Sequence, residues 1–235
     1  MQIDVFSDAD AVACAGARII ASEARAAIAA RGRFLLALSG GTTPLRMLAV
    51  LAAENLPWPQ IHIVQVDERF APAGDPDRNI VHLRRSLESS PHTATAHVYP
   101  MPVEAADLNA AAGKYAAMLR ALAGEPASAP PVLDLVHLGL GADGHTASLV
   151  PGDPVLNIAD RLVAVTGMYW RRQRMTLTYP VLNAARRILW LVTGPEKAPM
   201  LPRLLDADVG IPAGRVNQAE ALVLADRPAA TALPG

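Results

Sequence analysis

FLLALSGGTTP, residues 34–44, is a continuous apolar run that breaks at a glycine turn and continues into a segment with helical signals. The run Phe34–Leu38 predicts a buried strand. Thr43 followed by Pro44 predicts the N-cap and the first residue of a helix that ends near Glu54. A strand, a glycine turn and a helix in this order are typical of an α/β fold.

Two further apolar runs, Ile61–Val66 and Val132–Leu140, have the same character. Strands that are apolar on both faces and alternate with helices indicate the α/β class, with a mostly parallel sheet and helices on both faces. The remaining strands are expected at 162–165, 175–178, 188–192 and 221–224, and the remaining helices at 8–31 with Ser7 as cap, 79–87, 107–122, 180–186 and 195–205.

Composition favours one globular domain. The 235 residues are 51% hydrophobic and 18% charged, with a mean hydropathy of +0.22, which excludes intrinsic disorder. Only a Pro/Ala-rich stretch near 125–131 interrupts the pattern of strands and helices, and the composition is the same on both sides of it. We therefore expect a single domain over residues 1–235.

Charge, cysteine content and the N-terminus exclude several classes of protein. The 21 Lys and Arg against 22 Asp and Glu, with no basic run, argue against a nucleic-acid partner. The single cysteine, Cys14, excludes a disulfide framework and predicts a small buried thiol in a helix. Because there is no leader peptide and no run of 18 apolar residues, we expect a cytoplasmic protein without membrane contact.

Polar clusters follow three of the predicted strands, at Ser39–Thr43, Asp67–Arg69 and Asp143–His145. In open α/β sheets, ligands bind beyond the carboxyl ends of the strands. The three clusters are therefore expected to line one crevice.

The first cluster suits an anion. Two glycines allow close backbone approach, and the free N–H groups of a helix start favour a phosphate, although such a turn can also be only a tight turn. The cluster lacks the GK[ST] ending of a nucleotide P-loop. Arg171, Arg172, Arg174 and Lys197 are cations that could neutralise a phosphate.

The other two clusters suit acid–base chemistry. His145 could act as a base, Arg69 could hold an oxyanion, and Asp67 or Asp143 could orient the histidine. Gly139, Gly141 and Gly144 match GxGxxG, but the helix that should follow is interrupted by prolines, so a dinucleotide site is rejected. The remaining histidines are interpreted as structural or surface residues. We expect no metal, since there is no HExxH motif or cysteine pair, and no cofactor.

Five segments together resemble the 6-phosphogluconolactonase family, and they occur here in the family's order between residues 34 and 226: LALSGGTTP, VDERFAPAGDPDRN, DLVHLGLGADGHTASLVPG, RMTLTYPVLNAAR and LVTGPEKA. The resemblance implies a modified Rossmann-like α/β sheet, shared with glucosamine-6-phosphate deaminases and ribose-5-phosphate isomerases. It also implies hydrolysis of 6-phospho-D-glucono-1,5-lactone in the oxidative pentose phosphate pathway, with a small sugar-phosphate lactone as the partner.

The resemblance also implies roles for single residues. His145 would be the base that activates water, and Arg69 the partner of the developing charge. The residues that would hold the substrate phosphate are Ser39, Gly40, Gly41, Thr42, Thr43, Arg174 and Lys197. The chain departs from the family at Arg78, where serine is common, and around 168–170, where the family is commonly proline-rich.

The residues argue against two alternative functions. A deaminase or aldose-ketose isomerase of the same fold would carry a glutamate five residues after the histidine, where this chain has Val150. A non-enzymatic sugar-phosphate sensor would need a DNA-binding helix pair, for which there is no room before Phe34. Ester hydrolysis by a monomer is the expected function.

Overall fold

The computed structural model describes residues 1–88, 90–126 and 128–233. Ala127, in the Pro/Ala-rich stretch, and the last two residues of the predicted domain lie outside the described residues. The core is a seven-stranded sheet in the order β1-β10-β9-β6-β2-β3-β5, and every pairing in it is parallel. Its strands are β1 (Gln2–Phe6), β2 (Phe34–Leu38), β3 (Ile61–Gln65), β5 (His97–Tyr99), β6 (Leu135–Gly139), β9 (Ile188–Val192) and β10 (Ala221–Asp226).

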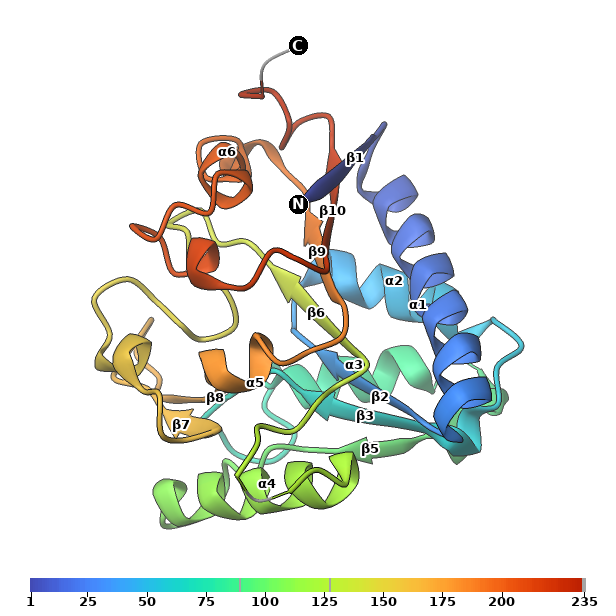
Figure 1. Cartoon of the computed structure of the whole chain (residues 1–235), viewed down its shortest axis with the longest axis vertical. Helices are drawn as coiled ribbons and strands as arrows, with labels where there is room; N and C mark the ends of the chain where they lie inside the picture. The colour runs from blue at the N-terminus through green and yellow to red at the C-terminus, as the bar shows by residue number, and fades with distance from the viewer. Residues whose placement is uncertain (89, 127, 234–235) are drawn as a thin grey trace.

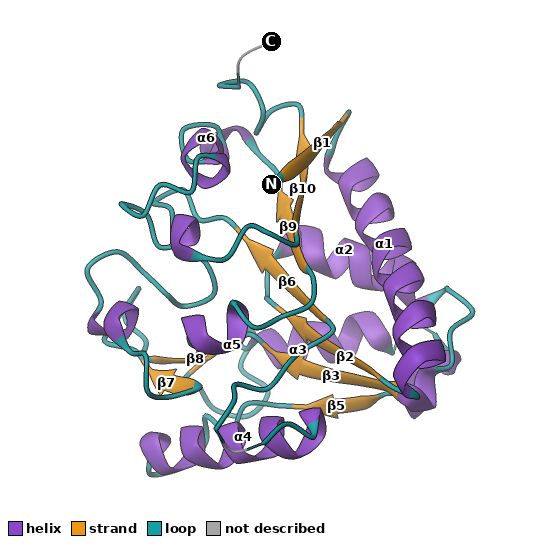
Figure 2. Cartoon of the chain, viewed as in Figure 1, coloured by secondary structure: helices purple, strands orange, loops and turns teal. Residues whose placement is uncertain are grey.

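Helices cover both faces of this sheet, which confirms the predicted fold class (Figures 1 and 2). One face carries α1 (Ala9–Arg31), α2 (Thr42–Ala52) and α3 (Asn79–Leu87), and the other carries α4 (Leu108–Ala123), α5 (Tyr179–Leu182) and α6 (Leu201–Leu205). Short 3-10 helices lie at 58–60, 91–95, 154–157, 195–197 and 213–215. Among the described residues, no helix is both long and apolar enough to cross a membrane.

The alternation of side chains along β2 explains why both faces need cover. Phe34, Leu36 and Leu38 pack into the core on the side of α1 and α2, whereas Leu35 and Ala37 pack into the core on the side of α4. All five residues are buried. A strand with no polar face must be covered twice, as the unbroken apolar run predicted.

The structure corrects the prediction for three segments, which form a second, antiparallel sheet in the order β4-β8-β7. These strands are β4 (Asp67–Arg69), β7 (Val163–Val165) and β8 (Arg174–Leu177). The chain leaves the main sheet at Val66, whose carbonyl accepts from the amide of Leu177. Asp67–Arg69 is therefore a strand in its own right rather than a loop at the end of β3, and 162–165 and 175–178 do not join the parallel sheet.

Several element ends also differ from the prediction. The carboxylate of Asp8, not Ser7, caps α1 by accepting from the amide of Ala11. Helix α2 begins at Thr42 after Gly41, with no side-chain cap, so Thr43 is not its N-cap. Strand β6 is shorter than predicted, and the predicted helices at 180–186 and 195–205 are reduced to α5 and to a 3-10 turn followed by α6.

The edge strands β1 and β5 were not predicted. Edge strands are partly exposed and need no unbroken apolar run, and β5 has only three residues.

Candidate active site

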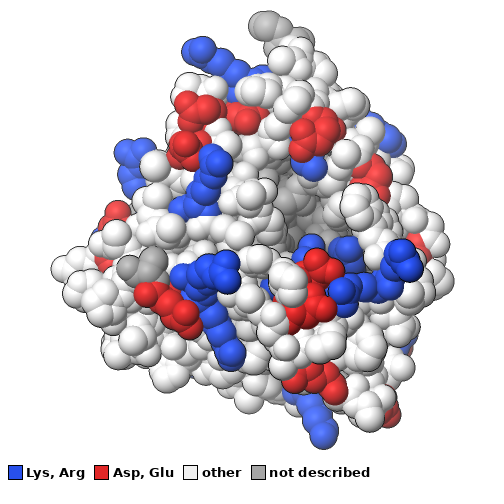
Figure 3. All heavy atoms as spheres, turned by 180° about the vertical axis from the view of Figure 1, so that it is seen from behind, with Lys and Arg blue, Asp and Glu red and all other residues white. Residues whose placement is uncertain are grey.

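A cavity of about 300 Å³ opens at the carboxyl ends of the parallel strands, next to the small sheet. Ten of the predicted site residues line it, from all three clusters and from the two later segments: Ser39, Gly40, Gly41, Thr42, Thr43, Asp67, Arg69, His145, Arg174 and Lys197. Asp143 is not in its lining but contacts His145. The prediction of one crevice is confirmed, and the face seen in Figure 3 is hollowed, with basic and acidic side chains around the hollow.

The glycine turn supplies one end of the cavity. Gly41 has φ 127°, which favours glycine, and α2 starts immediately after it with amide groups that no side chain caps. A Cβ on Gly40 would lie 2.0 Å from Oδ1 of Asn79, so a side chain there would displace that amide. This arrangement leaves backbone donors at a helix start for an anion.

Lys197 lies close to this turn, on the 3-10 helix 195–197. Its ammonium is 3.5 Å from a carboxylate oxygen of Glu196, and its side chain is 21% exposed. Across the cavity wall, the hydroxyls of Thr43 and Thr193 are 2.6 Å apart. One cation and two hydroxyls therefore accompany the backbone donors.

His145 and Asp143 form a pair on the turn after β6. Nδ1 of His145 is 2.5 Å from Oδ1 of Asp143, which also accepts from the His145 amide at 3.1 Å. A Cβ on Gly141 would lie 2.0 Å from this same Nδ1, so only glycine leaves room for the imidazole. With Nδ1 donating to the carboxylate, Nε2 is the acceptor available to a proton.

The environment keeps the Asp143 carboxyl ionised. Burial acts to raise its pKa, but hydrogen bonds from the His145 side chain and amide, together with the nearby Tyr169 hydroxyl, hold the pKa below its ordinary value. An ionised partner stabilises an imidazolium when the histidine takes up a proton.

Asp67 makes no such contact, although the sequence left it as an equal candidate. Its Oδ2 accepts from the hydroxyl of Ser148 at 2.6 Å, and its main-chain carbonyl accepts from the Asn79 side chain at 3.0 Å. Asp67 is 5% exposed. Of the two carboxylates, only Asp143 is placed to orient His145.

Arg69 and Arg174 bring two guanidinium groups to the cavity from neighbouring strands. Nη1 of Arg69 donates to the carbonyl of Asp77 at 2.6 Å. The Arg174 guanidinium lies 4.8 Å from the centre of the Tyr169 ring. Within the described part of the chain, the buried Nε atoms of both arginines have no hydrogen-bond partner, so both retain donor capacity.

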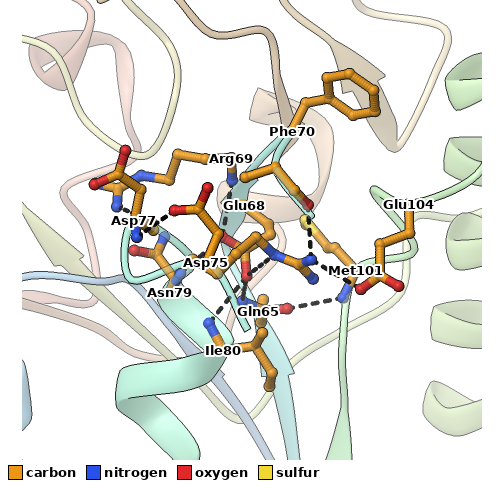
Figure 4. A network of polar contacts seen from close by, with 12 residues as sticks. Gln65, Glu68, Arg69, Phe70, Asp75, Asp77, Asn79, Ile80, Met101 and Glu104 are labelled. Carbon is orange, nitrogen blue, oxygen red and sulfur yellow. Dashed lines mark hydrogen bonds and ion pairs between the residues drawn. The ribbon is translucent and has the colours of Figure 1, made fainter. Parts of the chain in front are cut away.

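A buried carboxylate that the sequence analysis did not single out holds this region together (Figure 4). Glu68 is 0% exposed, and Oε2 is 3.2 Å from Nε of Arg78. It accepts further hydrogen bonds from the Gln65 side chain and from the amides of Arg69, Asn79 and Ile80. Glu68 thereby ties the start of α3 to β4 and positions Asn79 and Arg69 at the cavity.

Sequence reasoning missed other residues at the site. Asn79, Thr193 and Glu196 line the cavity, and Thr193 could have been found because it follows β9 at the same sheet edge as the predicted clusters. Arg78 is 3% exposed, held by Glu68 and Glu104, and is not part of the cavity lining. Its departure from the family pattern thus changes the support of the site and not the lining.

Other features that the sequence analysis considered have structural rather than catalytic settings. After Gly144 the chain forms turns and not a helix, in line with the rejection of a dinucleotide site. His137 is fully buried in β6, where Nδ1 accepts from the Ser39 amide at 3.3 Å. Cys14 is only partly buried in α1, which corrects the prediction of a buried thiol. In the described ranges there is no cluster of three or more His, Cys, Asp or Glu that could hold a metal ion.

Comparison with known proteins assigns the chain to a family. The family model described as glucosamine-6-phosphate isomerases/6-phosphogluconolactonase matches residues 7–224. The chain belongs to this family. The 6-phosphogluconolactonase of Synechocystis sp. is 41% identical over 171 residues, which are 73% of this chain and 71% of that protein. The 6-phosphogluconolactonase of Mycobacterium tuberculosis is 35% identical over 245 residues, covering 99% of this chain and 98% of that protein.

Solved structures of the family have the same fold. The 6-phosphogluconolactonase of Trypanosoma brucei superposes with a TM-score of 0.83 at 29% identity, covering 99% of this chain and 98% of that one. A monomeric glucosamine-6-phosphate deaminase superposes with a TM-score of 0.80 at 21% identity, covering 99% of this chain and all of that one. The fold is therefore common to both branches of the family, and the site residues must separate them.

Proposed function

We propose that the chain hydrolyses 6-phospho-D-glucono-1,5-lactone to 6-phospho-D-gluconate. Membership of the family and the 6-phosphogluconolactonase names of its relatives support the substrate. The observation that carries the proposal is His145, held by Asp143, in the same cavity as an uncapped helix start and Lys197. This cavity therefore combines a base, which suits the ester group, with a separate anion site, which suits the phosphate.

In the proposed reaction, Nε2 of His145 takes a proton from water while the water oxygen bonds to C1 of the lactone. Negative charge then grows on the carbonyl oxygen, where Arg69 would stabilise it. The bond from C1 to the ring oxygen breaks as the tetrahedral intermediate collapses, and the proton passes from His145 to that ring oxygen. Asp143 holds the imidazole in place throughout.

Direct attack by water is preferred to a covalent acyl-enzyme. Ser148 lies three residues after His145, but its side chain is fully buried and its hydroxyl donates to Asp67. It is not in the lining of the cavity. A serine nucleophile would need its hydroxyl on the base and within reach of the substrate.

Binding at the glycine turn, Arg174 and Lys197 would place the lactone against His145. The phosphate lies away from the reacting carbon and is bound equally well throughout the reaction. Its binding energy therefore positions the reacting carbon. Loss of that phosphate should therefore abolish efficient catalysis.

The test compares the phosphorylated and the unphosphorylated gluconolactone, after subtraction of the spontaneous rate of hydrolysis. We expect catalysis of the phosphorylated lactone only, and the His145→Asn variant should lose about 100-fold or more in kcat because it lacks the base. Binding of 6-phosphogluconate to that variant should be retained. Equal catalysis of both lactones, or a variant with normal turnover, would contradict the proposal.

The deaminase alternative is tested in parallel by ammonia release from glucosamine 6-phosphate. Val150, at the position where that branch resembles this chain and carries a glutamate, is 4% exposed and apolar, so we expect no release. The cytoplasmic location, the monomeric state and the absence of a nucleic-acid partner stay predictions of the sequence, and sedimentation of the purified chain checks the monomer.

A further inference from the structure

The segment between β7 and β8 is a tight hairpin turn beside the cavity. Tyr169 and Arg172 exchange main-chain hydrogen bonds of 3.0 and 3.2 Å across the turn. The two residues between them, Trp170 and Arg171, have φ of 51° and 64°, as a two-residue turn with left-handed residues requires. Trp170, at the tip, is 80% exposed. The turn holds Tyr169 at the site while its tip extends into solvent.

Tyr169 contacts three of the groups discussed above. Its hydroxyl donates to Oδ2 of Asp143 at 3.1 Å, while the other oxygen, Oδ1, faces Nδ1 of His145. Its ring packs edge-on to the His145 ring, with 5.7 Å between centroids, and the Arg174 guanidinium lies over the ring face. One side chain thus joins the orienting carboxylate, the base and a cavity cation.

The charge state of Tyr169 suits this position. Burial, and then the neighbouring Asp143 carboxylate, raise the pKa of Tyr169 above its ordinary value. The phenol therefore stays protonated at neutral pH and acts as a donor. A neutral donor on Oδ2 fixes the rotation of the carboxylate without neutralising it.

We propose that Tyr169 is a positioning residue for the reaction: its hydroxyl fixes the Asp143 carboxylate so that Oδ1 faces His145, and its ring seats the Arg174 guanidinium. This inference rests on the proposed function. It assigns a role to a segment in which the chain departs from the family's common pattern. Tyr169 acts through its neighbours and does not itself meet the substrate, because it is not in the cavity lining.

Two substitutions separate the role of the Tyr169 hydroxyl from that of its ring. Tyr169→Phe removes the hydroxyl and keeps the ring under Arg174, whereas Tyr169→Leu removes both. Met168→Ala, at an exposed residue of the same connection between β7 and β8, is the matched control for disturbance of this segment. The measurements are kcat, KM and the pH profile of kcat/KM for the full chain with the phosphorylated lactone.

For Tyr169→Phe we expect kcat to fall by about tenfold, the value of one hydrogen bond to a charged group, with KM changed less than about twofold. Without the donor, the Asp143 carboxylate is free to rotate away from Nδ1 and stabilises the imidazolium less, so the acidic limb of the profile moves to lower pH. The other charged groups of the cavity, which remain in both variants, are Asp67, Arg69, Arg174, Glu196 and Lys197. For Tyr169→Leu we expect KM to rise as well, because Arg174 loses its support.

A second measurement does not depend on activity. Nitrogen-15 NMR of the imidazole of His145 reports which ring nitrogen carries the proton. We expect one tautomer, with the proton on Nδ1, in the unchanged protein and in Met168→Ala, and a mixture in Tyr169→Phe.

Several results would overturn the inference. They are an unchanged pH profile and turnover in Tyr169→Phe, a loss of equal size when the change is made in the Asp143→Asn background, or an unchanged tautomer. A chain that shows the tautomer change but does not hydrolyse the lactone would instead overturn the proposed function and leave the positioning role standing.

Discussion

Arg69 and Arg174 lie directly opposite each other, in register, on the antiparallel strands β4 and β8. Like charges in this position destabilise a sheet. Burial lowers the pKa of Arg174 below its ordinary value, and the charge of Arg69 acts in the same direction. The repulsion between two cations is relieved when an anion lies between them, so this pair favours an anionic ligand, as the proposed function requires.

Removal of one of these charges should therefore weaken ligand binding without lowering the stability of the ligand-free protein. We predict that Arg174→Met unfolds at the same or a higher denaturant concentration than the unchanged chain when no ligand is present. Stabilisation by 6-phosphogluconate should fall, since about 1.5–3 kcal/mol is typical of one hydrogen bond to a charged group. Urea unfolding with and without product measures both. Arg227→Met, at an exposed arginine outside the cavity lining, is the control, and a ligand-free destabilisation well above that of the control would contradict this view of the pair.

Lys197 should serve binding more than chemistry. In the proposed function, Lys197 binds the substrate's phosphate equally in the ground and transition states, so Lys197→Ala should raise KM by about tenfold or more while kcat changes little. Steady-state kinetics with the phosphorylated lactone give both constants. The chain's other lysine, Lys114, is exposed on α4, and Lys114→Ala is the matched control. If kcat alone fell, Lys197 would belong to the catalytic step.

Breaking the buried ion pair between Glu68 and Arg78 should lower the free energy of unfolding substantially. Arg78→Met leaves the Glu68 carboxylate buried without its counter-ion, which destabilises a fold by about 3–5 kcal/mol. Glu104→Gln removes the other, largely exposed partner of Arg78 and should cost less than about 1 kcal/mol. The free energy of unfolding in urea measures both. Similar values for the two variants would show that Glu68 does not depend on Arg78.

His137 should make stability depend on pH. Complete burial lowers its pKa to about 3, from an ordinary value of 6.5. The unfolded chain therefore binds the extra proton first, and stability is present above pH 6.5 and is lost as the pH falls towards 3. Between pH 6.5 and 5 the loss from this group is on the order of 1–2 kcal/mol.

To isolate the contribution of His137 to the pH dependence of stability, His137→Gln is compared with the same change at the exposed His92. His137→Gln should lose less of its unfolding free energy between pH 6.5 and 5 than the unchanged chain, whatever its absolute stability. If the unfolding free energy of both variants depended on pH in the same way, His137 would not be the source of the pH dependence.

The sequence alone determined the α/β class and the strand ends that build the site. Unbroken apolar runs such as Phe34–Leu38 require cover on both faces, and a parallel sheet gathers the residues after each strand at one edge. The glycine turn and His145 therefore came together as predicted. Local patterns of this kind depend on neighbours within a few residues, and these neighbours are visible in the sequence.

Only the tertiary structure decided which carboxylate serves the histidine. Asp67 and Asp143 were equal candidates in the sequence, but Asp67 is held by Ser148, which lies 81 residues away. The turn of Tyr169 reaches Asp143 across 26 residues, and the second sheet sets Arg69 opposite Arg174 across more than 100 residues of chain. Such contacts have no periodicity and no local signal, because they arise from the packing of the small sheet against the edge of the large one, and packing depends on the whole folded chain.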